Sequence, residues 1–183
     1  TPSVSTRFLD EAFSVPYGIA PVGMSGLICP RAEHILTSLA QDEQLPYTLS
    51  TMATVSPEQI TGSVSQNVWF QLYCPKDEKI ALDILSRLKT QSISTLVVTV
   101  DLPGPSVRER QLASGLNIPP TINKRVLVDC LFKPVWALRQ LKNGPIGLPT
   151  LSKYTDVKSL ASTEHIGYKM RCNPDLGYLQ RIR

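Results

Sequence analysis

Three polar residues stand at or just after the apolar run TLVVTV, where packing alone gives no reason for them: Thr99, Asp101 and Arg108. Thr99 and Asp101 are two residues apart, so in an extended strand their side chains face the same side. A carboxylate is seldom placed at the end of a buried strand unless it is paired. Because α/β barrels build their active sites from polar groups at the carboxyl ends of buried parallel strands, this segment predicts an active site.

The same arrangement occurs one unit earlier in the chain. The run VWFQLY, residues 68–73, ends in Gln71 and Tyr73, which are also two apart and share a face. Two earlier apolar runs fit the scheme: residues 16–22, followed by Gly23, and residues 45–51, which include Ser50. The four runs recur at intervals of roughly 25 to 30 residues, the length of a βα unit in a barrel.

Helical patterns separate the four predicted strands. Apolar residues recur at helical spacing after Pro30, over residues 30–40, and again over 76–90, with a short helix predicted at 57–60. Alternating strands and helices predict an α/β fold with a parallel sheet and right-handed crossovers, most simply a barrel. At 183 residues the chain is short for eight units, so we expect a piece of a longer protein.

The composition argues against two classes of function. The net charge is only +4, and the lysines and arginines are scattered without interleaved aromatics, which speaks against nucleic-acid binding. The four cysteines form no C-x-x-C pair, and His34 and His165 stand at no ligand spacing, so no metal site is predicted.

Four segments together resemble a known family. PYGIAPVGMSG, TLSTMATVS, VWFQLY and TVDLPGPSVRER are similar to the first four βα units of the FMN-dependent 2-hydroxy acid dehydrogenases and oxidases, which include glycolate oxidase, L-lactate dehydrogenase and mandelate dehydrogenase. The resemblance runs in order along nearly all of the chain. It implies a TIM (β/α)8 barrel of which residues 1–183 cover about the first four units in one partial domain, and it implies FMN as the cofactor.

The resemblance assigns cofactor contacts to six residues. It implies that Ser50, Gln71 and Thr99 contact the FMN ring, and that the backbone of Pro21, Val22 and Gly23 lies against its reactive centre. A side-chain amide can satisfy both donors and acceptors on the pyrimidine edge of a flavin. Taken singly, Ser50 and Thr99 could be ordinary strand residues, and Gly23 a simple turn glycine. The family often has alanine at the position of Gly23, and its mandelate dehydrogenase-like members have glycine, which favours a dehydrogenase.

The resemblance also implies a substrate site. Arg108 corresponds to the arginine that holds the substrate carboxylate, which a guanidinium can bind through two hydrogen bonds. Tyr73 corresponds to a catalytic tyrosine facing the substrate, although it could be a core aromatic. Asp101 corresponds to the aspartate that stabilises the protonated catalytic histidine, although it could anchor a loop. That histidine comes from later units, and neither His34 nor His165 follows a strand, so we expect no turnover by this chain alone.

The expected reaction is the FMN-dependent oxidation of an L-2-hydroxy acid to the 2-oxo acid, with L-lactate as the favoured substrate. A quinone or a cytochrome would accept the electrons, and the parent protein would be a homo-oligomer. The alternatives are an oxidase that uses oxygen, as in glycolate oxidase, another flavin- or phosphate-binding barrel, and a catalytically dead truncated barrel with a binding role.

A long connection of poor periodicity is expected from about residue 112 to 173. Its apolar stretch at 126–138 is too short to span a bilayer and could be a helix over the site or an interfacial anchor. KPVWALRQLKNGPIGLPTLSKY resembles the corresponding region of membrane-associated bacterial lactate dehydrogenases. Lys133, Arg139 and Lys142 beside Trp136 would suit the inner membrane surface, whereas packing on the parent barrel or a neighbouring subunit is the other option. The expected location is cytoplasmic, peripheral at most.

Overall fold

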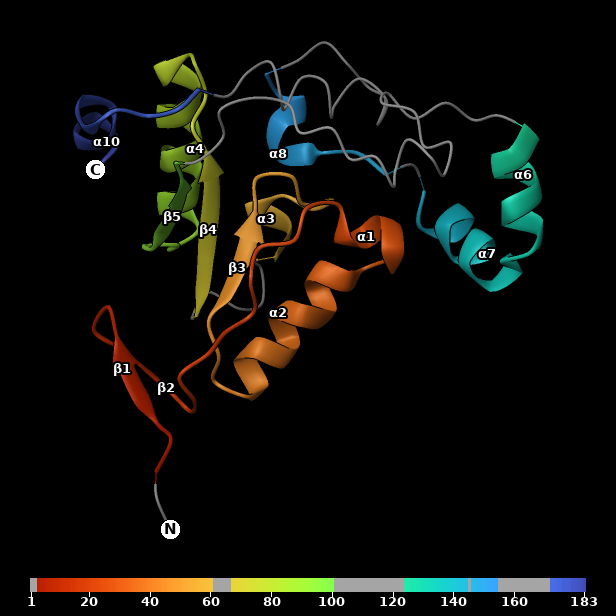
Figure 1. Cartoon of the computed structure of the whole chain (residues 1–183), viewed down its shortest axis with the longest axis horizontal. Helices are drawn as coiled ribbons and strands as arrows, with labels where there is room; N and C mark the ends of the chain where they lie inside the picture. Colours follow the sequence, from red (N-terminus) through yellow and green to blue (C-terminus); the bar gives the residue numbers. More distant parts are fainter. Residues whose placement is uncertain (1–2, 61–66, 101–123, 145, 155–171) are drawn as a thin grey trace.

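The computed structural model describes residues 3–60, 67–100, 124–144, 146–154 and 172–183 (Figure 1). The strands are β1 (Thr6–Phe8), β2 (Glu11–Phe13), β3 (Tyr47–Ser50), β4 (Val68–Tyr73) and β5 (Leu96–Thr99). The helices are α1 (Ser25–Ile28), α2 (Ala32–Asp42), α3 (Pro57–Ile60), α4 (Glu78–Thr90), α6 (Lys124–Leu131), α7 (Pro134–Asn143), α8 (Pro149–Ser152) and α10 (Leu176–Ile182).

Three of the predicted strands form a parallel sheet in the order β3-β4-β5. Tyr47 pairs with Val68 at the start of β3, and Tyr73 pairs with Thr99 at the end of β4. The predicted first strand, residues 16–22, is wrong as a full strand, because only Ile19 makes a parallel bridge, to Tyr47. This segment follows the edge of β3 and then turns away into α1. The α/β class is confirmed, with helices connecting parallel strands.

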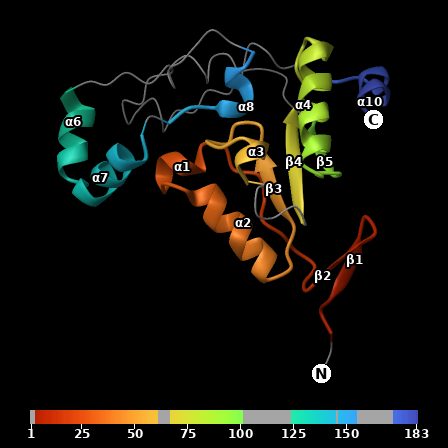
Figure 2. The same ribbon diagram turned by 180° about the vertical axis from the view of Figure 1, so that it is seen from behind.

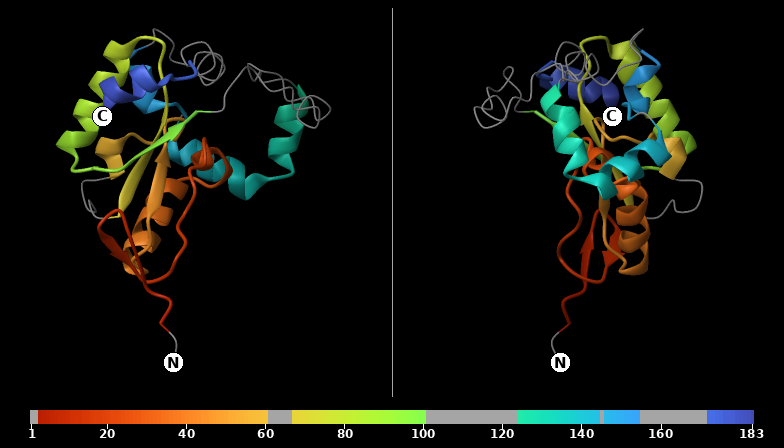
Figure 3. Two further views of the ribbon diagram at one scale, coloured as in Figure 1. Left: turned by 60° about the vertical axis from the view of Figure 1, so that its left-hand side comes forward. Right: turned by 90° about the vertical axis from the view of Figure 1, so that its right-hand side faces the viewer.

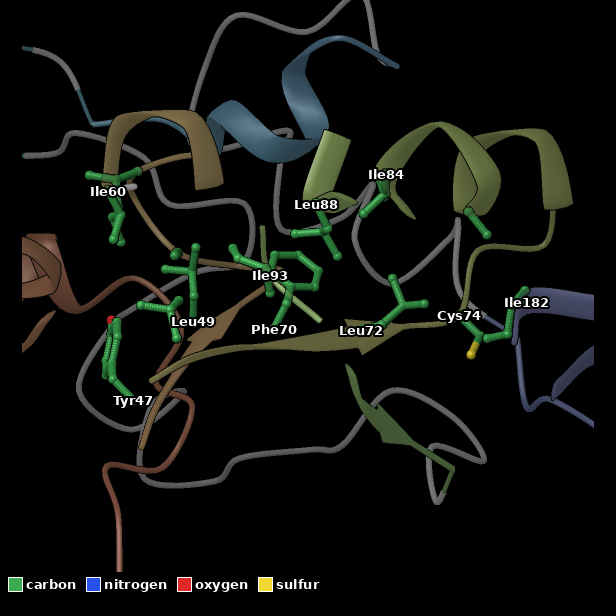
Figure 4. Packing of buried hydrophobic residues seen from close by; sticks show 14 of the residues in the cluster. Tyr47, Leu49, Ile60, Phe70, Leu72, Cys74, Ile84, Leu88, Ile93 and Ile182 are labelled. Carbon is green, nitrogen blue, oxygen red and sulfur yellow. The ribbon is translucent and has the colours of Figure 1, made fainter. Parts of the chain in front are cut away.

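One face of the sheet carries the hydrophobic core. Leu49, Phe70 and Leu72 are fully buried, and they pack against apolar residues of α3, α4 and α10 (Figure 4). Alternation along each strand places the neighbouring residues on the opposite face. Helices α2, α3 and α4 follow one another on the core side, which is also visible from behind (Figure 2). The other face of the sheet is therefore left for polar groups.

The predicted helices are confirmed, but α2 and α4 begin two residues later than predicted. Helix α2 begins at Ala32 rather than Pro30, because Arg31 has a left-handed backbone, with φ of 65°. Its buried face is not fully apolar, because Ile35 and Leu39 are exposed and the buried positions include Glu33 and Thr37. Helix α4 begins at Glu78 after Asp77, whose side chain caps it by accepting a hydrogen bond from the backbone of Lys79.

A short antiparallel hairpin lies at the end of the sheet where the strands begin (Figure 3). The rings of Phe8 and Phe13 in the hairpin lie 5.9 and 6.0 Å from the ring of Trp69 in β4. The indole nitrogen of Trp69 also donates to Glu11, at 3.4 Å. These contacts cover the opposite end of the sheet from the one at which the predicted site residues stand.

The long connection is not uniformly irregular. It contains α6, α7 and α8, and the apolar stretch 126–138 belongs to two helices that are separated before Pro134, which opens α7. Helix α10 packs against α4, where Arg181 forms an ion pair with Glu78 at 2.6 Å. No helix within the described ranges is long and apolar enough to cross a membrane.

An ion pair between α3 and α4 should make stability depend on pH. The hydrogen bonds from Arg87 lower the pKa of Glu58 to about 2 from its ordinary 4.5, and Arg87 Nε lies 2.6 Å from Glu58 Oε1. Because the folded-state pKa is lowered, this contribution is present above pH 4.5 and is lost as the pH falls towards 2. We expect Glu58→Gln to be less stable than wild type at neutral pH, with the difference vanishing in this window.

Urea denaturation at successive pH values measures this difference. Glu43→Gln, the same chemical change at an exposed position after α2, is the matched control. Its difference from wild type in free energy of unfolding should not change as the pH falls through this window. A Glu58→Gln penalty that stays constant down to about pH 2 contradicts the assignment of the pH dependence to this pair.

Candidate functional site

The face of the sheet opposite the core carries a row of polar side chains near the carboxyl ends of the strands. Ser50 is registered with Gln71, and Tyr73 with Thr99, so these four residues share one face. Ser50 and Gln71 are buried, whereas Tyr73 and Thr99 are half-buried. Parallel strands end at the same edge of a sheet, which is why residues about 20 to 50 positions apart in sequence converge here.

A chain of hydrogen bonds joins the three strands through the side chain of Gln71. Ser50 Oγ donates to Gln71 Oε1 at 3.1 Å, and Gln71 Nε2 donates to Thr99 Oγ1 at 2.8 Å. The backbone N–H of Thr51 also donates to Gln71 Oε1, at 3.3 Å. Two donors on Oε1 and one acceptor at Nε2 fix the orientation of the amide. These three side chains, from three neighbouring strands, are thus in direct contact with one another.

Thr51 is a residue that sequence reasoning missed. Its hydroxyl donates to the carbonyl of Gln71 at 2.5 Å and accepts from the backbone N–H of Tyr73 at 3.2 Å. The side chain therefore continues the ladder between β3 and β4 beyond the last residue of β3. The signal was present as a second hydroxyl directly after Ser50, in the sequence TLST.

The turn of Pro21, Val22 and Gly23 lies beside the loop that follows β3. Its position is set by the backbone N–H of Met24, which donates to the carbonyl of Met52 at 2.8 Å. A Cβ at Gly23 would lie 3.1 Å from Met52 Cβ and 4.0 Å from Ser50 Oγ, so a side chain here would crowd the loop. The three turn residues are exposed and stand next to the polar row.

The two charged residues predicted for the site, Asp101 and Arg108, lie outside the described residues. The site as described consists of neutral hydroxyl and amide groups and the phenol of Tyr73. Such a row can bind a planar heteroaromatic ring with alternating donors and acceptors. The donor and acceptor set of Ser50, Gln71 and Thr99, with a crowded glycine turn beside it, fits a flavin ring.

Comparison with known proteins gives a family and a set of relatives. The profile of the FMN-dependent dehydrogenase family matches residues 1–183. L-lactate dehydrogenase from Pseudomonas syringae pv. syringae (strain B728a) is 34% identical over 167 residues, which are 91% of this chain and 43% of that protein. L-lactate dehydrogenase from Pseudomonas entomophila (strain L48) is 36% identical over 153 residues, 83% of this chain and 40% of that protein.

Two solved structures are similar to this fold. The monotopic membrane protein (S)-mandelate dehydrogenase matches 98% of this chain and 49% of its own, with a TM-score of 0.88 and 25% identity. A mandelate oxidase variant with (S)-mandelic acid matches 64% of this chain and 35% of its own, with a TM-score of 0.59 and 32% identity. The chain thus spans about half, or less, of the relatives it matches.

Proposed function

Because this chain belongs to the FMN-dependent dehydrogenase family, whose cofactor is FMN, we propose that it supplies part of the active site of an L-2-hydroxy acid dehydrogenase, with L-lactate as the first substrate. The observation that carries the proposal is the Ser50–Gln71–Thr99 chain of hydrogen bonds across the ends of three parallel strands. Sequence similarity to two L-lactate dehydrogenases supports the choice of substrate.

The chain's own residues would bind and orient the cofactor. Gln71 would present its amide to the pyrimidine edge of the flavin, with Ser50 and Thr99 holding that amide in place. The backbone of residues 21–23 would lie against the ring, where Gly23 permits a close approach. When bound, FMN would accept the two electrons that the 2-hydroxy acid loses.

The substrate would be held by residues on the same strand ends. Tyr73 shares the face of Gln71 and Thr99, so its phenol would stand beside the substrate. Arg108 would bind the substrate carboxylate, and Asp101 would stabilise the protonated histidine base that the later units supply. His34 lies within α2 rather than at a strand end, and His165 lies outside the described residues; we propose that the chain has no turnover alone. The parent would be a barrel of which about four βα units are present here.

Visible absorption spectra test the proposal. The chain, and a version extended along its reading frame through later units, would be recorded without oxygen, before and after L-lactate or (S)-mandelate is added. A flavin band in the extended protein that L-lactate bleaches supports the proposal, with no bleaching expected in the chain alone. An extended protein without flavin contradicts the roles of Ser50, Gln71 and Thr99, and bleaching by (S)-mandelate alone contradicts the choice of substrate.

A 2-hydroxy acid oxidase is the second candidate, and Gly23 disfavours it. By the resemblance described above, the family often has alanine at that position, whereas its mandelate dehydrogenase-like members have glycine. Here a Cβ would lie 3.1 Å from Met52 Cβ. Oxygen electrode measurements on the bleached protein separate the two: rapid oxygen uptake supports an oxidase, and re-oxidation by a quinone or cytochrome supports a dehydrogenase.

We also propose that α6 and α7 attach the protein to the inner membrane surface. The polar side of α7 faces the fold, because Trp136 Nε1 and Gln140 Nε2 each donate to the carbonyl of Leu27 at 2.9 Å. The opposite side is apolar and exposed, with Leu138 66% and Leu141 79% accessible. Three basic residues lie in α7 or directly before it, namely Lys133, Arg139 and Lys142. An anionic lipid surface matches both the apolar area and the charge.

Vesicle binding checks the membrane proposal. We expect the protein to sediment with vesicles that contain anionic lipid, and Leu138→Glu to weaken this binding by about tenfold or more, since burial of a leucine stabilises by about 1.5–3 kcal/mol. Leu82→Glu is the matched control, because Leu82 is an exposed leucine of α4. No sedimentation with any vesicle contradicts the proposal and indicates packing on the barrel or on another subunit.

A further inference from the structure

Glu33 is a buried carboxylate that the proposed chemistry does not use. It stands in the first turn of α2 and is 0% exposed. A charged residue is almost never fully buried unless several donors compensate it. Its position on the core-facing side of α2, in line with Thr37 and Ala40, gives it a neighbour on the loop after β3.

Three donors converge on one oxygen of Glu33. Thr54 donates to Oε1 twice, from its backbone N–H and from its hydroxyl, each at 2.8 Å. The backbone N–H of Gly26 donates to the same oxygen at 3.4 Å. Burial, the largest single effect, raises the pKa of Glu33, but the hydrogen bonds to the carboxylate, those from Thr54 foremost, together hold the pKa below its ordinary value. Glu33 is therefore ionised at neutral pH.

The two segments that Glu33 joins are the ones that flank the proposed flavin. Gly26 is three residues after Gly23 of the turn, and Thr54 is four residues after Ser50. Between them, Met24 N–H donates to the carbonyl of Met52 at 2.8 Å. The close approach of Gly26 and Thr54 leaves no room for a side chain at Gly26, where a Cβ would lie 2.1 Å from Thr54 Oγ1. The carboxylate and the glycine thus form one tight junction.

We propose that Glu33 is a positioning residue, which clamps the turn at residues 21–23 to the loop at residues 50–54 and so sets the width of the flavin site. This inference rests on the proposed function, since the site's ligand is FMN. It requires no contact between Glu33 and the cofactor. Loss of the clamp would let both segments move apart while the sheet stays intact, because β3, β4 and β5 are held together by their own backbone pairing.

Hydrogen exchange without FMN tests the clamp itself. We expect Glu33→Ala to speed exchange of the amides of Gly26 and Thr54 by about tenfold to a hundredfold, since a hydrogen bond to a charged group contributes about 1.5–3 kcal/mol. Exchange in β4 should stay unchanged. Glu33→Gln keeps the shape and one acceptor oxygen, so the amides of Gly26 and Thr54 should exchange more slowly in it than in Glu33→Ala. Glu43→Gln, exposed after the same helix, should change nothing.

FMN titration of the full protein, that is, the version extended through the later βα units, tests the link between the clamp and the cofactor. We expect the Kd for FMN to rise about tenfold or more in Glu33→Ala and less in Glu33→Gln. It should rise again in Gly26→Ala, which keeps the carboxylate of Glu33 but would displace Thr54 Oγ1 and crowd Glu33 Oε2 at 3.2 Å. Unchanged exchange at Gly26 and Thr54 overturns the clamp, as does a uniform rise in exchange over the whole chain. Faster local exchange with an unchanged Kd overturns its role at the flavin site. A wild-type protein that binds no FMN contradicts the proposed function, and is recognised before any variant is compared.

Discussion

Replacing Gln71 by leucine is expected to raise the Kd for FMN about a hundredfold while the fold survives. Leucine has a similar size, but it removes the amide that accepts from Ser50 and donates to Thr99. In the complex, each polar group of the flavin edge that loses its partner costs about 1–3 kcal/mol, and every 1.4 kcal/mol corresponds to a tenfold change in Kd. Fluorescence quenching of FMN on titration with the full protein measures the Kd.

The matched control for this variant is Gln41→Leu. Gln41 is an exposed glutamine of α2, so the same chemical change there should leave the Kd unchanged. Thr51→Val is a second comparison, because it removes a hydroxyl that bonds only backbone groups of β4. We expect it to lower the free energy of unfolding more than the FMN affinity. A Gln71→Leu protein with wild-type affinity contradicts the assignment of Gln71 to the flavin.

The convergence of Ser50, Gln71 and Thr99 could be predicted from sequence because three simple rules act together. Buried strands read as apolar runs, parallel strands end at one edge, and residues two apart share a face. The same rules predicted a full strand at 16–22, which the structure reduces to one bridge at Ile19. Apolar composition indicates a buried segment, but it does not show whether that segment pairs with the neighbouring strand along its whole length.

The clamp at Glu33 could not be predicted in the same way. A glutamate in the first turn of a helix is ordinary, because the helix dipole favours it there. The sequence predicts a buried face of apolar residues over 30–40, whereas the structure exposes Ile35 and Leu39 and buries Glu33 and Thr37. Only the tertiary positions of Thr54 and Gly26 explain this choice, since their three donors meet at Glu33 Oε1. Local periodicity carries no information about a donor 21 residues away.

Replacing Phe70 by alanine is expected to lower the free energy of unfolding by about 3–5 kcal/mol. Phe70 is 0% exposed and lies at the centre of the core between β3, β4 and the helices (Figure 4). Truncation leaves a cavity that rigid strands cannot close, so the loss exceeds the transfer free energy of the removed atoms. Urea denaturation of the full protein, followed by circular dichroism, measures the change.

Phe132→Ala provides the matched control, because Phe132 is a phenylalanine that is 78% exposed. We expect its free energy of unfolding to stay within about 0.5 kcal/mol of wild type. A Phe70→Ala protein as stable as this control contradicts the placement of Phe70 in the core.

Phe70 and Gln71 are neighbours on one strand, so their variants separate stability from cofactor binding. Alternation places Phe70 on the core face and Gln71 on the polar face. We therefore expect the folded fraction of Phe70→Ala to bind FMN with nearly wild-type affinity, whereas Gln71→Leu stays folded and loses that affinity. If instead Gln71→Leu unfolds the protein and its folded fraction keeps the wild-type affinity for FMN, the polar face supports the fold and the cofactor lies elsewhere. A single strand with one face for the core and one for chemistry is what a barrel requires of each βα unit.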